Sequence, residues 1–217
     1  MSRVLLCSIL LTALTLPAIH AQDASSSSAP RHTRKAPESA STLDSGSVLN
    51  GVYHNKTLAL SVKIPTGWVL RTEEMNARDE QPSTDAKSAQ SSAKVLLAAF
   101  SRPPEARAED VNSSILIAAE PVSTYPGLKH AAQYFGPLTE VAKAQGFTAD
   151  EDPYESAVGT KTLARGDFHK DVGSRVMHQS TLALLSHGCA ISITVIAGTE
   201  DDVEELIDGL TFSPSGK

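Results

Sequence analysis

Two histidines and two aspartates in one stretch of the chain have the types and the spacing to bind a metal ion. Asp167, His169 and Asp171 occupy alternate positions, so they share one face if this stretch is a regular strand. A reversal of the chain over residues 171–174 would bring His178 on the next strand roughly opposite Asp167. Imidazole nitrogens and carboxylate oxygens together suit zinc or manganese, so these four residues are the candidate metal ligands.

The competing interpretation of the same residues is an ordinary polar end of a sheet near a hairpin. Polar side chains are common at such exposed ends. A slip of one residue in strand register would also turn His178 to the opposite face. We therefore predict no cofactor and keep the metal site as a hypothesis to be tested.

Signatures of other chemistry are sparse. Ser186-His187-Gly188 offers a hydroxyl and an imidazole, but it lies at a predicted turn without a G-x-S-x-G elbow. The sequence has no glycine-rich phosphate loop, no C-x-x-C pair and no H-E-x-x-H helix. Asn55-Lys56-Thr57 and Asn112-Ser113-Ser114 match glycosylation sequons. The sequence thus favours a non-catalytic binding or assembly protein, with a metal-dependent or hydrolytic enzyme as the alternative.

The first 49 residues predict an export signal followed by a tether. Arg3 precedes an apolar run over residues 4–16, and Ala18-Ile19-His20-Ala21 offers a cleavage site, so residues 1–21 predict a signal peptide. The apolar run is too short to span a bilayer, which predicts no transmembrane segment. Residues 22–49 are rich in Ser, Ala and Pro, which is typical of a disordered tether. We therefore expect a periplasmic or extracellular protein.

Composition limits the size of the folded part and the class of its partner. A length of 217 residues with 41% hydrophobic residues suits one ordinary domain with a core, expected over residues 50–214. The formal net charge is −6, whereas nucleic acid binding draws on clustered positive charge. The sequence therefore excludes nucleic acid as the expected partner.

Local patterns predict the elements that must position these residues. Alternating apolar residues predict strands over 58–64, 94–100, 114–122, 154–159, 161–170, 175–186 and 189–196. Residues 128–145 predict an amphipathic helix broken at Gly136-Pro137, and Thr199 is expected to cap a final helix. Residues 73–93 lack periodicity and predict a mobile insertion. The expected fold class is α+β, a single domain built on an antiparallel sheet.

Three stretches of the chain carry a family resemblance. They are Gly51-Val52-Tyr53-His54-Asn55, then Ile64-Pro65-Thr66-Gly67-Trp68, and the pattern Leu182 to Ile196 followed by an acidic helix and Leu210-Thr211-Phe212. In these stretches the chain resembles the PsbP-like superfamily, which includes the extrinsic PsbP protein of photosystem II, Ran-binding Mog-type proteins and bacterial envelope proteins. The resemblance implies a twisted antiparallel sheet flanked by helices on both faces, a PsbP-like α/β/α sandwich. With the leader and the tether, it favours another envelope protein or a small ligand as partner and leaves the oligomeric state open.

Overall fold

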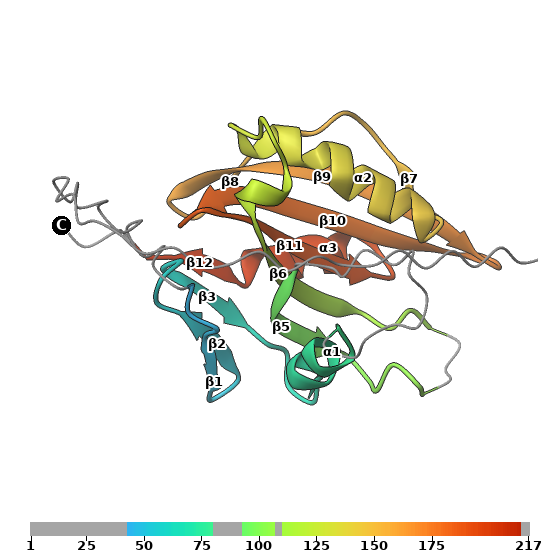
Figure 1. The fold of residues 1–217 in the computed structure, drawn as a ribbon. Coiled ribbons are helices and arrows are strands. Elements are labelled where there is room, and N and C mark those ends of the chain that lie inside the picture. The colour runs from blue at the N-terminus through green and yellow to red at the C-terminus, as the bar shows by residue number, and fades with distance from the viewer. Residues whose placement is uncertain (1–42, 80–92, 107–109, 214–217) are drawn as a thin grey trace, which may run out of the picture. The chain divides into compact units, whose positions relative to one another are not determined.

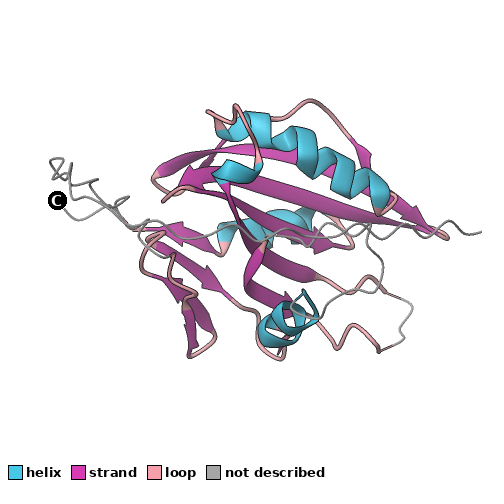
Figure 2. Ribbon diagram, in the orientation of Figure 1, coloured by secondary structure: helices cyan, strands magenta, loops and turns pink. Residues whose placement is uncertain are grey.

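Strands dominate the structure, a computed structural model in which residues 43–79, 93–106 and 110–213 are described (Figures 1 and 2). The smaller sheet has the strand order β1 (Ser47–Leu49), β2 (Val52–Asn55), β3 (Leu60–Lys63) and β12 (Leu210–Phe212). The larger sheet has the order β4 (Val69–Leu70), β5 (Lys94–Phe100), β6 (Ser114–Pro121), β11 (Cys189–Ala197), β10 (Arg175–Ser186), β9 (Lys161–Val172) and β7 (Thr148–Ala149). Strand β8 (Tyr154–Val158) also pairs with β9.

The helices of the described residues are short. They are α1 (Thr72–Asp79), the 3-10 helices η1 (Val122–Thr124) and η2 (Ala131–Tyr134), α2 (Phe135–Ala144) and α3 (Glu200–Asp208). The helix predicted over 128–145 divides into η2 and α2, and Pro137 lies in the first turn of α2, where its missing N–H breaks no helical hydrogen bond. The Thr199 cap is confirmed, because Thr199 Oγ1 accepts a hydrogen bond of 3.1 Å from the N–H of Asp202.

The main core lies between the two sheets. It brings together apolar side chains from both sheets and from α3, among them Tyr53, Leu60, Val62, Ile117, Leu182, Ile193, Leu206 and Ile207. A second cluster lies on the other face of the larger sheet, where α2 runs along β9 and β10 (Figure 1). Its buried members include Tyr134, Phe135, Ala142, Phe147, Ala164 and Phe168.

The prediction of an α+β sandwich with helices flanking both faces is wrong. The described residues form mostly antiparallel strands in two sheets, with few helices. The reason lies in residues 47–63, where buried Tyr53, Leu60 and Val62 belong to short strands with more exposed neighbours. Such a pattern folds as a sheet, and this second sheet packs on the core where the prediction placed a layer of helices.

Two segments that were expected to lack regular structure contain short elements. Helix α1 covers the start of the expected insertion 73–93, of which residues 80–92 lie outside the described residues. Asn76 attaches α1 to the edge of β5, since its carboxamide donates to the Val95 carbonyl and accepts from the Val95 N–H, both at 2.9 Å. Strand β1 lies at the end of the expected tether, while the predicted signal peptide lies outside the described residues. The domain boundaries remain predictions.

Both predicted hairpins of the larger sheet are present, but β9 runs to Val172, so the turn to β10 comprises residues 173–174 and not the expected 171–174. His187 and Gly188 connect β10 to β11 and have φ values of 51° and 75°, as a two-residue hairpin turn requires. Gly173, with φ 65°, lies in the turn between β9 and β10. Because both turns are tight, the side chains of β9, β10 and β11 keep fixed partners across the sheet.

Candidate functional site

The four candidate metal ligands lie on one face of the larger sheet. In the β9–β10 ladder His169 lies opposite His178, and Asp167 lies opposite Ser180. This register differs by two residues from the expected one. A shift of two preserves the face, so His178 still projects on the same side as Asp167 and His169.

Each candidate ligand has its own surroundings. His169 Nδ1 contacts Asp150 Oδ1, and His178 Nδ1 lies 3.7 Å from Glu200 Oε1. Asp167 accepts hydrogen bonds from Tyr154 and Arg165, and Asp171 is exposed near the hairpin end. In the described ranges no group of three His, Cys, Asp or Glu side chains is arranged to hold a metal ion. Metal binding by these four residues therefore stays a prediction.

Replacement of His169 tests the metal hypothesis. We expect His169→Ala to change the free energy of unfolding by less than about 0.5 kcal/mol, because the His169–Asp150 pair is partly exposed and solvent screens it. Urea denaturation with and without a chelator measures this, and elemental analysis of the purified protein measures bound metal. A large zinc-dependent loss of stability, together with stoichiometric metal in the unmutated protein, would instead support a metal site.

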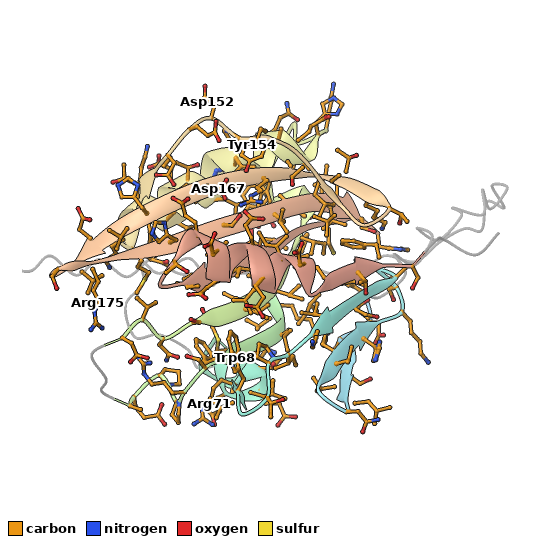
Figure 3. The ribbon with its side chains drawn as sticks, turned by 180° about the vertical axis from the view of Figure 1, so that it is seen from behind. Trp68, Arg71, Asp152, Tyr154, Asp167 and Arg175 are labelled. Atoms are coloured by element: carbon orange, nitrogen blue, oxygen red, sulfur yellow. The ribbon has the colours of Figure 1, made fainter. Side chains whose placement is uncertain are left out.

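Two of these four residues, Asp167 and His178, line a cleft of about 290 Å³. Strands β9 and β10 form its floor, the first half of α3 forms one wall, and the loop from β7 to β8 forms the other. The N–H of Asp150 in this loop donates to the Asp167 carbonyl at 3.0 Å, which fixes the loop to β9. Figure 3 shows Tyr154 and Asp167 over the strands above α3, with Asp152 at the outer end of the loop.

Arg165 lines the cleft and is held by two carboxylates. Its Nε donates to Asp167 Oδ1 at 3.0 Å, and its Nη1 donates to Glu204 Oε2 at 3.2 Å, with a second, close contact from Nη2 to Glu204 Oε1. Burial alone would lower the pKa of Arg165, but its bonds to Glu204 and Asp167 outweigh burial and raise it. The guanidinium therefore stays charged and fixed between β9 and α3.

Tyr154 also lines the cleft. Its hydroxyl donates to Asp167 Oδ2 at 2.6 Å, and its ring lies 5.9 Å from the Arg165 guanidinium carbon. Burial, the hydrogen bond to Asp167 and the charge of that carboxylate raise the pKa of Tyr154. The phenol consequently keeps its proton at neutral pH and acts as a donor.

The cleft carries an excess of negative charge. Five carboxylates line it, those of Asp150, Glu151, Asp167, Glu200 and Glu204. Arg165 is the one lysine or arginine among its lining residues and is already paired. Since a cleft with charges of one sign concentrates ions of the other sign, this arrangement attracts cations.

Sequence reasoning missed most of the residues that build the cleft. Arg165 could have been predicted, because it alternates with Asp167 and His169 along the strand and therefore lies on the same face. No local sequence pattern indicates that Asp150 and Glu204 belong to this cleft. They reach β9 from a loop and a helix that are 19 and 39 residues away along the chain from their partners.

A larger groove of about 590 Å³ lies between β1 and β2 on one side and α1 and β5 on the other. Its basic side chains already have partners. Arg71 bonds to Glu74 at 3.2 Å and to Glu105 at 3.3 Å, and Lys94 Nζ donates to Ser45 Oγ at 2.7 Å. This larger groove has no excess of either charge and no group of polar side chains that point to one place. Its volume alone therefore does not make it the better candidate site.

The second chemical motif of the sequence lies away from the cleft. Ser186 is the last residue of β10, and His187 lies in the turn to β11. Their place in the hairpin is the predicted one, and the turn explains both residues structurally.

The fold and the cleft define a class of protein: an antiparallel two-sheet domain that carries an acidic cleft beside its last helix. No family model matches the chain, and no curated protein matches it. Solved structures similar to it include LpqN, involved in cell envelope biogenesis of Mycobacterium tuberculosis, at 14% identity and a TM-score of 0.36, covering 71% of this chain and 83% of that one.

Two further solved structures are similar to the chain. The Saccharomyces cerevisiae Ran-binding protein Mog1p has 12% identity and a TM-score of 0.39, covering 71% of this chain and 90% of its own. The protein of unknown function PA94 from Pseudomonas aeruginosa has 13% identity and a TM-score of 0.37, covering 76% and 97%. With TM-scores below 0.5, these likenesses carry no argument about the fold, ligands or partners of this chain.

Proposed function

We propose that the chain is a non-catalytic binding protein of the cell envelope or extracellular space, and that its acidic cleft binds a positively charged ligand. The observation that carries the proposal is the excess of carboxylates in the cleft, where Arg165, the one arginine among the described lining residues, is already paired. The proposal includes membership of the PsbP-like superfamily, for which the motifs around Trp68 and Leu210 are the support.

The proposed location rests on the sequence. The charged start at Arg3, the apolar run and the small-residue cleavage site support export. Within the described ranges, none of the helices has the length and apolarity needed to cross a bilayer.

Some carboxylates of the cleft are already paired within the chain, and others are free to bind basic side chains of a partner. Asp167 and Glu204 are committed to Arg165, so they contribute negative charge to the cleft. Glu200 is 84% exposed and makes only a long contact with His178, so it can accept hydrogen bonds from a ligand. Glu151, on the opposite wall, is exposed as well.

Binding of a labelled hexalysine peptide tests this function. We expect the double variant Glu151→Gln/Glu200→Gln to weaken binding at low salt by at least about fivefold, as two charge contacts of roughly 0.5 kcal/mol each would do. Fluorescence anisotropy measures the dissociation constant. The matched control is Glu205→Gln/Asp208→Asn, which removes the same charge from the far end of α3, outside the cleft.

Two results would contradict the proposal. One is no saturable binding of hexalysine by the unmutated chain. The other is an equal loss of affinity in the cleft variant and in the control variant, because this would reduce the effect to net charge.

A further inference from the structure

Two histidines face each other across neighbouring strands of the larger sheet. His169 of β9 and His178 of β10 are direct partners in the antiparallel ladder, so their side chains leave the same face. Residues in such positions have Cβ atoms about 5 Å apart. The two side chains are 38% and 22% exposed, so solvent and ions reach both imidazoles. The register thus holds two metal-binding side chains next to each other.

Each imidazole has a carboxylate at its Nδ1 atom. Asp150, in the loop after β7, contacts Nδ1 of His169, and Oε1 of Glu200, the first residue of α3, lies 3.7 Å from Nδ1 of His178. These carboxylates come from different elements, since β7 pairs with β9 and α3 contacts β10. A carboxylate at Nδ1 favours the tautomer that carries its proton there, and it makes Nε2 a stronger ligand.

The Nε2 atoms of the two rings are available to a ligand. Among the described residues, neither atom has a hydrogen-bond partner. Asp167, on the same face, is already bonded to Tyr154 and Arg165. In this part of the chain no three His, Cys, Asp or Glu side chains are arranged to hold a metal ion. The pair therefore offers two nitrogen ligands and leaves the remaining coordination positions to water.

The type and number of ligands select the metal. For a given site the affinity of divalent ions rises along the first transition series to Cu²⁺ and falls again at Zn²⁺. Structural zinc sites use four protein ligands, whereas Cu²⁺ accepts a tetragonal set of nitrogen and oxygen atoms. Two imidazoles completed by water therefore suit Cu²⁺ better than zinc or manganese. The carboxylates of Asp150 and Glu200 beside the rings add negative charge that attracts a cation.

We infer that His169 and His178 bind one Cu²⁺ ion through their Nε2 atoms, while Asp150 and Glu200 hold the two rings. The inference goes beyond the proposed function and does not depend on it, because the ligands are imidazoles and not the carboxylates of the cleft. It agrees with the small effect expected for His169→Ala on the metal-free protein. An ion held by two protein ligands is readily removed by a chelator.

Titration of the full, untagged chain with copper(II) sulfate tests the inference. Calorimetry should show saturable binding of one Cu²⁺ at the tightest site, and electron paramagnetic resonance should show coupling to two imidazole nitrogens. His169→Ala and His178→Gln should each weaken this binding at least about tenfold. His54→Ala is the control, because this exposed histidine of β2 contacts only Ser61 and should change the affinity less than about twofold.

A second pair of variants tests the role of the carboxylate. Asp150→Asn keeps the shape of the side chain but removes its charge, and it should weaken Cu²⁺ binding at least about fivefold. Glu151→Gln removes the same charge from the next residue, which makes no contact with either histidine, and it should change the affinity less than about twofold. Equal losses in these two variants would reduce the effect to net charge and overturn the positioning role of Asp150.

Three results would overturn the copper site itself. The first is no saturable binding, or a spectrum with fewer than two nitrogens. The second is a loss of affinity in His54→Ala as large as that in His169→Ala. The third is zinc binding as tight as copper binding. Circular dichroism checks that each variant is folded. If His178→Gln does not fold, His169→Ala and the spectrum of the unmutated chain decide the question.

Discussion

Replacement of Asn55 by alanine is expected to lower the free energy of unfolding by about 2 to 4 kcal/mol. Asn55 is 1% exposed, and every polar group of its side chain is used. Its Nδ2 donates to the Asp44 carbonyl at 2.7 Å and to the Tyr53 hydroxyl at 3.1 Å, and its Oδ1 accepts from the Leu58 N–H at 2.9 Å. Alanine would leave these partners unpaired beside the core, where water cannot replace the lost bonds.

Urea denaturation followed through Trp68, the only tryptophan of the chain, measures the effect. Thr57→Ala is the control, because it destroys the same sequon but removes only the 3.3 Å bond from the Asp44 N–H to Thr57 Oγ1. We expect it to cost less than about 1 kcal/mol. Equal losses in the two variants would show that the Asn55 carboxamide does not hold this region together.

The same contacts bear on the two glycosylation sequons. A glycan on Asn55 would need its buried amide nitrogen, which already donates two hydrogen bonds. Asn112 is also engaged, since its Oδ1 accepts from Ser101 Oγ at 2.9 Å and its Nδ2 donates to the Arg102 carbonyl at 3.1 Å. Both asparagines therefore have structural roles that explain their presence without modification.

The second large effect is expected at Gly166, where alanine should destabilise the fold by about 1 to 3 kcal/mol. Gly166 lies on β9 between Arg165 and Asp167, on the face covered by η2 and α2. A Cβ atom there would lie 2.6 Å from Cε1 and 2.9 Å from Cδ1 of the Phe135 ring. Phe135 is only 2% exposed, so its ring has no free space to move into.

Thermal or urea unfolding measures this loss of stability. Two further variants test whether the clash with Phe135 causes it. Gly198→Ala is the control, because its Cβ would make only ordinary contacts with Val111 at 3.7 Å, and we expect a change within about 0.5 kcal/mol. Combining Gly166→Ala with Phe135→Leu should recover part of the loss, since the smaller side chain frees space. Strictly additive losses in the double variant would show that Phe135 is not the cause.

Gly166→Ala should also affect the opposite face of the sheet. The steric clash with the Phe135 ring would move the backbone that carries Arg165 and Asp167, so we expect weaker hexalysine binding as well as lower stability. The core of one face thus helps to position the cleft on the other.

Local sequence patterns were enough to predict most strands, turns and helix starts of this protein. Alternation of apolar residues predicted β9, β10 and β11, because the period of a strand is visible in neighbouring residues. His187-Gly188 predicted the β10–β11 turn, and Thr199 predicted the start of α3, because turns and caps depend on backbone geometry over a few residues. The two-residue shift of His178 shows the limit of this reasoning, since register depends on where the turn begins.

The number of sheets and the composition of the cleft depend on contacts between distant parts of the chain. A short strand such as β12 pairs with β3 across about 150 residues of chain, and its own three residues do not indicate which partner it joins. In the same way, Arg165 meets Glu204 because α3 packs on the core beside β9 and β10, a consequence of burying Val203, Leu206 and Ile207. Long-range burial fixes such contacts, and no local pattern encodes them.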